Sequence, residues 1–227
     1  MNILEEIKKR PNAQLVIQEA IKFLNDETEK RTAFRNWIDE SMKAEFINGE
    51  VILHSPVKNK HLNASDLLSR ILSVHSSNKK LGRVKTEKAM ISLTRNDYEP
   101  DICFFGNEKA DKFTADQMLF PAPDLVIEIL SKSTAKRDKG IKFEDYAAHG
   151  IKEYWIIDPD KQKVEQFALL GDLKEYFPIA TVYYDDDIKS RVVEGFEIPV
   201  AAIFEEKANM EALKKLITAY FFSFFKT

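Results

Sequence analysis

The amino-acid sequence predicts a mixed α/β domain built around one sheet, with additional helices at both ends of the chain. Three observations predict this class: an N-terminal stretch with helical spacing of apolar residues, a series of short apolar runs typical of strands, and two helical stretches between those runs. Helices and strands in this arrangement usually pack as layers around a common core. The 227 residues are enough for one such domain with appendages.

Residues 1–44 are expected to form a helical extension ahead of the core. They contain many good helix formers, and apolar residues recur near helical spacing from Leu15 to Leu24. Pro11 interrupts an early turn, because proline cannot donate a backbone hydrogen bond inside a helix. The predicted core spans residues 45–204, and residues 205–227 are expected to form a C-terminal helix with an aromatic end.

The core is predicted to open with a hairpin and a helix. Two short apolar runs flank Asn48-Gly49, a dipeptide that accepts the positive φ angles of a tight turn. Residues 61–76 then predict a helix. Its inward-facing residues are expected to be Leu62, Leu67, Leu68, Ile71 and Leu72.

Most of the remaining core is predicted to be strand. The expected strands are 84–93, 101–105, 124–130, 153–158, 163–169, 176–184 and 192–200. The run 124–130 has five large aliphatic residues in seven, which predicts a strand buried on both faces in the middle of the sheet. Ser133 or Thr134 is expected to cap one helix that runs to His149 and ends at Gly150.

Glu128 stands in the middle of this aliphatic strand, where an ionised carboxylate is costly unless it is paired, protonated or bound to a metal. Asp124 is expected to face the same side, because strand side chains alternate, and Asp101 opens another predicted strand. Converging carboxylates repel one another, and Mg²⁺, which prefers oxygen ligands, would relieve that repulsion. The alternative is a Glu128 that faces solvent or pairs with a lysine or arginine.

Composition excludes several classes of protein. The single cysteine, Cys103, excludes a disulfide framework and any cysteine-based zinc site, and it is expected to be an inert core thiol. No stretch approaches the roughly 20 apolar residues that cross a bilayer, and the N-terminus lacks the apolar centre of a secretory signal. We therefore expect a cytoplasmic protein with no membrane partner. A net charge of −3 with local basic clusters is compatible with phosphate contacts.

An ordered set of motifs runs through the predicted core. The set comprises Phe46-Ile-Asn-Gly-Glu-Val-Ile-Leu-His-Ser-Pro56, His61, Glu99-Pro-Asp-Ile102, Pro123-Asp-Leu-Val-Ile-Glu-Ile-Leu-Ser131, Ser133-Thr134, Arg137-Asp138, Lys142, Tyr146 and Glu153-Tyr-Trp-Ile-Ile-Asp-Pro159. It resembles the Uma-type family of bacterial restriction endonucleases, which belongs to the PD-(D/E)XK nuclease superfamily. The resemblance covers residues 45–200. It implies a restriction-endonuclease-like fold, with a mixed central sheet flanked by helices, and it leaves the N-terminal and C-terminal helices as local additions.

The resemblance also implies roles for individual residues. Asp101 corresponds to the superfamily's metal-binding aspartate and Glu128 to its second acid, while the main-chain carbonyl of Ile129 would complete the metal shell. The superfamily's lysine two residues later is Leu130 here, and Lys142 matches the position that takes its place in this family. Lys132 is a rival for that role. The structural alternative for Lys142 is a solvated side chain on an amphipathic helix.

Auxiliary roles are expected at further positions. Glu45 or Glu50 could be an outer metal ligand, as could Asp124 beside the two principal acids. His61 could contact phosphate or a water on the metal, although a helix-capping or surface histidine is the alternative. Tyr146 is expected to share a helix face with Lys142 and to lie in the core or at the rim of the site.

These roles predict an endonuclease that depends on Mg²⁺ or Mn²⁺ and hydrolyses DNA phosphodiester bonds. A divalent ion polarises the phosphate and lowers the pKa of bound water, and a nearby ammonium positions that water or stabilises charge. Two alternatives stay open: a catalytically inactive nucleic-acid-binding or assembly protein that keeps the fold, and a metallohydrolase that acts on another phosphoester. DNA is the expected partner. A homodimer is a further expectation, and the aromatic tail 220–225 could form its interface or cap the core.

Overall fold

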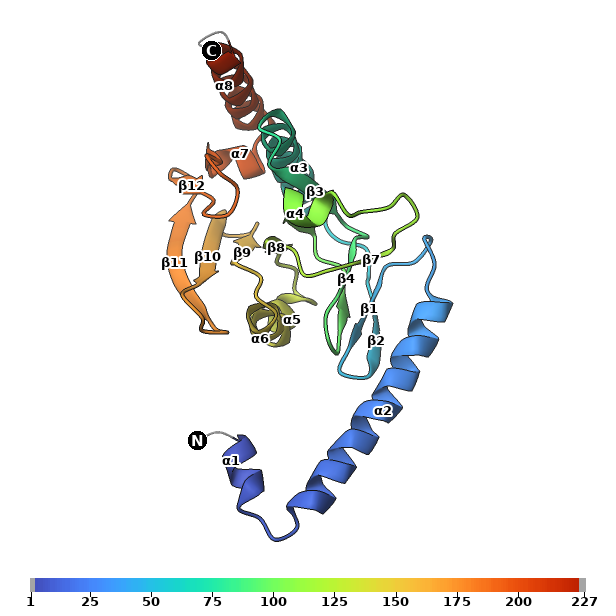
Figure 1. Cartoon of the computed structure of the whole chain (residues 1–227). Coiled ribbons are helices and arrows are strands. Elements are labelled where there is room, and N and C mark those ends of the chain that lie inside the picture. The colour runs from blue at the N-terminus through green and yellow to red at the C-terminus, as the bar shows by residue number, and fades with distance from the viewer. Residues whose placement is uncertain (1–2, 225–227) are drawn as a thin grey trace. The chain divides into compact units, whose positions relative to one another are not determined.

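The structure is a computed structural model that describes residues 3–224 and the side chains of residues 3–218. The chain divides into two compact units (Figure 1): Met1–His54 with Thr94–Tyr98, and Ser55–Leu93 with Glu99–Thr227. The mixed α/β class that the sequence predicts is confirmed, because both units combine helices with strands. In the described part of the chain, no helix is both long enough and apolar enough to cross a membrane.

The first unit combines the N-terminal helices with a small antiparallel sheet. Its elements are α1 (Ile3–Lys8), α2 (Ala13–Trp37), β1 (Ala44–Ile47), β2 (Glu50–Leu53) and β5 (Asp97–Tyr98). The predicted hairpin is confirmed, since β1 pairs with β2 and the turn residues Asn48 and Gly49 have φ angles of 50° and 83°. The predicted helical region is interrupted around Pro11, as expected, and it ends at Trp37 because Ile38 has extended backbone angles.

Two arginines hold α2 to the sheet of the first unit. Arg31 and Arg35 both donate hydrogen bonds to the carboxylate of Asp97 on β5, at 2.6–2.9 Å. Burial alone would raise the pKa of Asp97, but the two guanidinium groups outweigh burial and hold it below its ordinary value. Phe34, on α2, packs against Phe46 of β1 with ring centroids 5.7 Å apart.

The second unit is centred on a six-stranded mixed sheet. In spatial order its strands are β11 (Tyr176–Tyr183), β10 (Lys163–Leu169), β9 (Glu153–Asp158), β8 (Leu125–Ile129), β6 (Ile102–Gly106) and β3 (Gly82–Thr86). Strands β8 and β9 are parallel, and the other neighbouring pairs are antiparallel. Two smaller pairs lie outside this sheet: β4 (Met90–Ser92) with β7 (Leu119–Phe120), and β12 (Asp187–Lys189) with β13 (Glu197–Pro199). The expectation of one sheet is therefore wrong.

Helices cover both faces of the six-stranded sheet (Figure 1). One face carries α3 (Asn59–Asn78), α7 (Ala201–Phe204) and α8 (Glu206–Phe224), and the other carries α5 (Ala135–Asp138) and α6 (Ile141–Ala148); the short α4 (Asn107–Ala110) follows β6. The first face forms the main apolar core, in which Leu68 and Ile71 of α3 cluster with Ile127 and Trp155 of the sheet. Because α6 covers the opposite face, β8 is buried along its whole length, as the sequence predicts.

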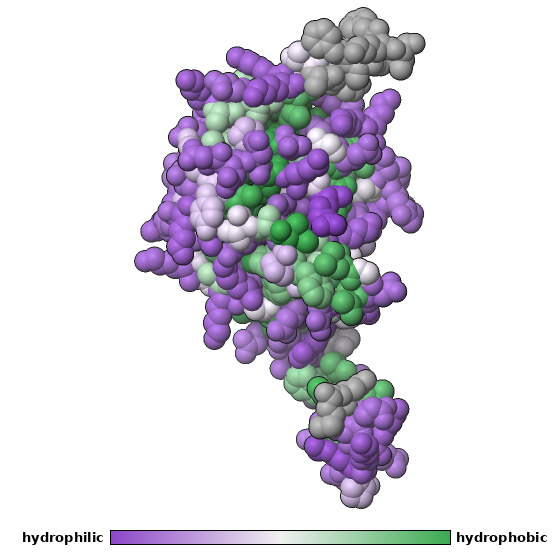
Figure 2. All heavy atoms as spheres, turned by 90° about the vertical axis from the view of Figure 1, so that its left-hand side faces the viewer, coloured by the Kyte–Doolittle hydropathy of each residue, from purple (hydrophilic) through white to green (hydrophobic). Residues whose placement is uncertain are grey.

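One side of the second unit ends in β11, which is an edge strand. The surface seen from this side is largely hydrophilic, with apolar patches between the polar side chains (Figure 2). Pro178 interrupts the row of backbone donors on β11, and the register with β10 shifts between Gln166 and Phe167. Proline and bulges at an edge oppose pairing with a strand from another chain.

Two predicted elements are interrupted by the backbone. The predicted strand 84–93 is wrong as one element, because Glu87 has a φ of 58° and turns the chain between β3 and β4. The predicted helix from Ser133 to His149 is wrong in the same way, because Gly140 has backbone angles of −118° and −105° that are not helical and that separate α5 from α6. The end of that segment at Gly150, with a φ of 75°, is confirmed.

Smaller differences concern the last strand and one helix face. The predicted strand 192–200 is wrong: only 197–199 is extended, as β13, and its partner β12 is a strand that the sequence analysis missed. Leu62 is wrong as an inward-facing residue, since it is 43% exposed, whereas Leu67, Leu68, Ile71 and Leu72 are buried as predicted. The side chains of the aromatic tail 220–225 lie outside the described residues.

Candidate active site

The register of β6 and β8 brings the two predicted metal-binding acids together. Ile102 pairs with Ile127 in the antiparallel direction, so Asp101, one residue before β6, lies opposite Glu128. Opposite residues of an antiparallel pair share a face of the sheet, with Cβ atoms about 4.5–5.5 Å apart. This face is the one covered by α6, because Lys142 of that helix contacts Glu128. Both acids are therefore on the side away from the main apolar core.

The carboxylate of Asp101 is held by two donors. The backbone amide of Ile129 donates a hydrogen bond to its Oδ2 at 2.7 Å, and Nε2 of His61 lies 3.3 Å from the same oxygen. The amide and carbonyl of one strand residue point toward the same neighbouring strand. The carbonyl of Ile129 is therefore directed to the side on which Asp101 lies. His61 belongs to the first turn of α3 and is 5% exposed, so it is not a surface histidine.

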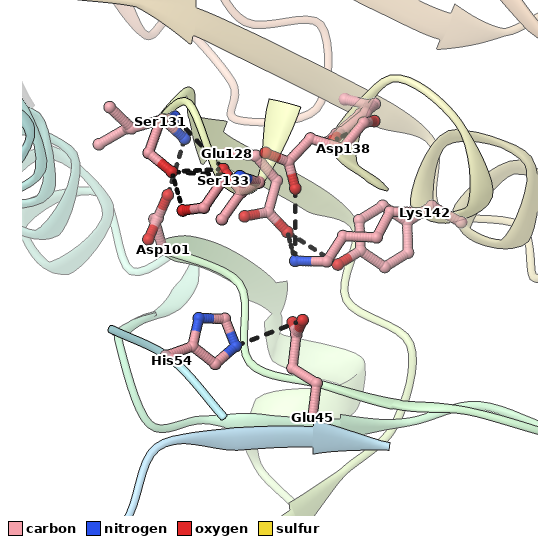
Figure 3. Close-up of polar contacts among 12 residues, drawn as sticks. Glu45, His54, Asp101, Glu128, Ser131, Ser133, Asp138 and Lys142 are labelled. Carbon is pink, nitrogen blue, oxygen red and sulfur yellow. Dashed lines mark hydrogen bonds and ion pairs between the residues drawn. The ribbon is translucent and has the colours of Figure 1, made fainter. Parts of the chain in front are cut away.

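Helix α6 supplies two donors to Glu128 (Figure 3). The ammonium of Lys142 lies 3.0 Å from Oε1 of Glu128, and the hydroxyl of Tyr146 donates to the same oxygen at 2.9 Å. The two donors are four residues apart, which is one turn of the helix. Glu128, Lys142 and Tyr146 are 3%, 2% and 0% exposed, so a solvated Lys142 is excluded and Glu128 is a buried, paired carboxylate.

Asp138 is a member of this cluster to which the sequence analysis assigned no role. Its Oδ1 lies 3.6 Å from the ammonium of Lys142, and its side chain is 1% exposed (Figure 3). The signal that could have identified it is the spacing of four residues to Lys142 within a segment predicted as one helix, since that spacing places two side chains on one helix face. The contact persists although Gly140 separates the two helices. Its backbone carbonyl also accepts a hydrogen bond from the hydroxyl of Tyr154 at 3.0 Å.

The electrostatics of the cluster are dominated by its acids. Asp101, Glu128 and Asp138 carry three negative charges against the single positive charge of Lys142, a formal sum of −2. Burial raises the pKa of the Tyr154 hydroxyl, and the nearby charges of Glu128 and Asp138 raise it further. Burial also raises the pKa of the Cys103 thiol, and Glu128 adds to the shift, so this thiol stays protonated.

The donor set fits a divalent ion that keeps much of its water. Within the described residues, no group of three or more histidine, cysteine, aspartate or glutamate side chains could enclose a metal ion. Mg²⁺ does not require such a cage, because it is usually bound by one or two carboxylates and retains several waters. Asp101 and Glu128 supply two carboxylates, and their partners include the amide of Ile129, the imidazole of His61, the ammonium of Lys142 and the hydroxyl of Tyr146.

Asp124 lies apart from this cluster although it shares a strand face with Glu128. Its carboxylate accepts the backbone amide of Gly106 at 2.9 Å and pairs with Lys109 and Lys152 at 2.9 and 3.1 Å. Burial alone would raise the pKa of Asp124, but these donors outweigh burial and lower it. Asp124 thus stays ionised through its own lysines. Of the two or three carboxylates that were expected to converge, Asp101 and Glu128 lie opposite each other and Asp124 has separate partners.

The predicted auxiliary glutamates belong to the first unit. Glu45 is fully buried on β1, where its Oε2 lies 3.3 Å from Nε2 of His54. Glu50, on β2, is exposed. The rival lysine, Lys132, belongs to the second unit, is exposed, and lines a cavity of about 380 Å³ that also includes His61.

Comparisons with known proteins identify the family of this chain. Residues 31–201 match the model of the Uma2 family, described as "Putative restriction endonuclease". The uncharacterized protein sll1609 of Synechocystis sp. is 32% identical over 133 residues, which cover 57% of this chain and 74% of that protein. A crystal structure from Anabaena variabilis, described as a "putative nuclease belonging to DUF820", has a TM-score of 0.64 at 18% identity and covers 79% of this chain and 96% of its own, which establishes a shared fold. The chain belongs to the Uma2 family of restriction-endonuclease-like proteins.

Proposed function

We propose that this protein is a Mg²⁺-dependent endonuclease that hydrolyses phosphodiester bonds in DNA, with Mn²⁺ as an alternative ion. The observation that carries the proposal is the meeting of Asp101, Glu128 and Lys142, which come from three separate segments of the chain. The family description and the name of the Anabaena protein support the nuclease class. The specific steps, the metal and the DNA substrate are our inference from the chemistry of the site.

Asp101 and Glu128 would hold the ion, together with the carbonyl of Ile129. When bound, a divalent ion polarises the phosphate and lowers the pKa of water. The formal charge of −2 on Asp101, Glu128, Asp138 and Lys142 is the opposite of the charge that such an ion carries. The amide of Ile129 and the imidazole of His61 restrict the orientation of Asp101, so that little reorganisation is needed when an ion arrives.

Lys142 would act on the phosphate or on the attacking water. Hydrolysis builds negative charge on the non-bridging oxygens, and an ammonium fixed beside them stabilises that charge without reorganisation. Tyr146 would position Glu128, since its hydroxyl donates to the oxygen that Lys142 also contacts. Both contacts to Glu128 are about 3 Å long, so the Lys142 ammonium stays next to the carboxylate that would bind the ion.

The test combines metal binding with cleavage. The purified chain is incubated with plasmid DNA in Mg²⁺, Mn²⁺ or EDTA, and Mn²⁺ binding is measured separately by titration calorimetry. Asp101→Asn and Glu128→Gln remove one charge each at nearly constant volume, so both are expected to lose cleavage and to weaken Mn²⁺ binding. The matched control is Glu144→Gln, an exposed residue of the same helix as Lys142, which is expected to behave as the wild type.

Four outcomes separate the alternatives. Loss of cleavage and of metal binding in both site variants, but not in the control, supports the proposal. Equal cleavage by wild type and site variants indicates a contaminating nuclease and rejects it. Binding of DNA with neither metal uptake nor cleavage supports a binding-only protein, and cleavage of nucleotides but not of DNA supports a metallohydrolase for another phosphoester.

A further inference from the structure

A basic cavity adjoins the proposed metal site in the second unit. Its volume is about 380 Å³, and His61 lines it while contacting Asp101 at 3.3 Å. Three lysines line it as well: Lys58 and Lys60 from the start of α3, and Lys132 from the loop after β8. Two aspartates, Asp158 and Asp160, also contribute, so the five charged residues sum to +1 without His61. The cavity is therefore positive beside a cluster of acids.

The partners of these charged groups differ. Lys60 forms an ion pair with Asp160, and the Asp158 carboxylate accepts the backbone amides of Asp160 and Lys161 at 3.0 and 3.2 Å. Both acids are thus engaged locally. In the described part of the chain, the ammonium groups of Lys58 and Lys132 make no hydrogen bond or ion pair. Two uncompensated cations therefore face one cavity.

We infer that this cavity binds a phosphate of the DNA strand next to the scissile one, with Lys58 and Lys132 as its ligands. The inference rests on the proposed function, since it assigns a second phosphate position beside the metal site. A lysine ammonium binds phosphate as a point charge through three rotatable donors, so two of them from different segments suit a mobile backbone phosphate. Each such contact releases counterions from DNA, which favours binding at low salt.

The remaining lining suits a nucleotide chain better than a free inorganic anion. Val57 and Leu130 contribute apolar side chains to the lining, and Ser131 and Ser133 contribute polar ones. A deoxyribose presents apolar carbon atoms next to its phosphate oxygens, so this mixture matches a strand of DNA. Lys132 was considered above as a rival of Lys142 for the catalytic role. Here it has a different role, because it lines the cavity, whereas Lys142 contacts Glu128.

The experiment measures DNA binding without cleavage. A fluorescein-labelled DNA duplex is titrated in EDTA with the full chain, and anisotropy gives the association constant at a series of salt concentrations. The slope of log K against log salt is expected to become less steep by about 0.9 for each lysine lost, in Lys58→Gln and Lys132→Gln, and by about twice that in the double variant. Lys112→Gln changes an exposed lysine that does not line the cavity, and it is expected to keep the wild-type slope.

A cleavage assay then separates this inference from the proposed function. In Mg²⁺, the double variant is expected to raise KM for DNA several-fold and to keep kcat, because it removes binding shared by the ground and transition states. A double variant with the wild-type slope and wild-type KM overturns the inference, even if Asp101→Asn abolishes cleavage. If the double variant has a less steep slope but the wild-type protein never cleaves DNA, the cavity is a phosphate-binding site and the proposed nuclease function is rejected.

Discussion

The ammonium of Lys142 lies 3.0 Å from Oε1 of Glu128, and both side chains are almost completely buried. Removing one member of such a buried pair leaves an uncompensated charge and costs about 3–5 kcal/mol. The same lysine is therefore a structural partner of Glu128 and, under our proposal, a catalytic group. These two roles predict opposite effects on metal binding and on cleavage.

Lys142→Met is expected to abolish cleavage while strengthening Mn²⁺ binding several-fold. The lysine competes with a cation for Glu128, so its loss removes that competition. The metal-free variant is expected to lose about 3–5 kcal/mol of unfolding free energy in urea, and saturating Mn²⁺ is expected to restore part of it. Lys136→Met, an exposed lysine on α5, serves as the control and is expected to change none of these quantities. Weaker Mn²⁺ binding in Lys142→Met would contradict the competition.

Asp138→Asn is expected to lower kcat by roughly tenfold, equivalent to about 1.4 kcal/mol, with KM unchanged. The substitution keeps the shape of the side chain but removes the charge that lies 3.6 Å from Lys142. The ammonium would then keep its contact with Glu128 but lose the nearby charge of Asp138. Single-turnover cleavage measures the effect, and Asp138→Glu is expected to restore part of the rate because it restores the charge. A variant that loses stability but keeps kcat would show that Asp138 is only structural.

Glu153→Gln is expected to lower the unfolding free energy by about 2–3 kcal/mol, because a buried amide would face donors that now meet a carboxylate. Oε2 of Glu153 accepts the Ser190 hydroxyl at 2.8 Å and the amides of Arg191 and Val192 at 3.0 Å, and Oε1 accepts the indole N–H of Trp155 at 2.7 Å. This carboxylate joins β9 to the loop between β12 and β13. Urea unfolding of the variant measures the loss.

The matched control for that prediction is Glu197→Gln on β13. Its side chain is 56% exposed and pairs with Lys189 at 3.5 Å. Exposed pairs contribute about 0–1 kcal/mol, so this variant is expected to unfold almost as the wild type does. Equal losses in the two variants would show that the hydrogen bonds of Glu153 are not the cause.

Protonation of His75 is expected to destabilise the fold as pH falls from 7 to 5. Burial and the nearby Lys79 lower the pKa of His75 below its ordinary value of 6.5, although its bond to the Glu194 carbonyl at 2.9 Å opposes the shift. Below pH 6.5 the unfolded chain therefore takes up the proton before the folded chain does, and unfolding free energy is lost until pH reaches the folded pKa. His75→Gln is expected to reduce this pH dependence in urea unfolding, and an unchanged dependence would assign it to other groups.

The sequence predicted most of the elements because their patterns are local. The aliphatic run of β8 and the Asn48-Gly49 turn depend on few residues, and both are confirmed. The breaks at Glu87 and Gly140 were missed, because a single residue with unusual backbone angles changes neither hydrophobic periodicity nor composition. Strand β12 was missed for another reason: its three residues pair only with the distant β13.

Prediction of the candidate site depended on information of a different kind. The burial of Glu128 follows from its own strand, but its neighbours Asp101 and Lys142 are set by strand register and by the packing of α6, which no local pattern encodes. Asp101 was a candidate because it opens a predicted strand, and the motif resemblance gave it the metal-binding role and selected Lys142. Asp124 shows the limit of strand parity, because residues on one face four positions apart are roughly 13 Å apart along a strand and can have separate partners.

The pairing of Asp101 with Glu128 across β6 and β8 also restricts how this chain can change in length. A shift of one residue sends every side chain of a strand to the opposite face. Deletion of one residue inside β8 would therefore direct the Glu128 carboxylate into the apolar core beneath α3 and place an isoleucine where the ion is expected. Insertions in the connecting loops carry no such consequence. Relatives that preserve the chemistry are therefore expected to differ in the length of their loops but to have no insertion or deletion within β6 and β8.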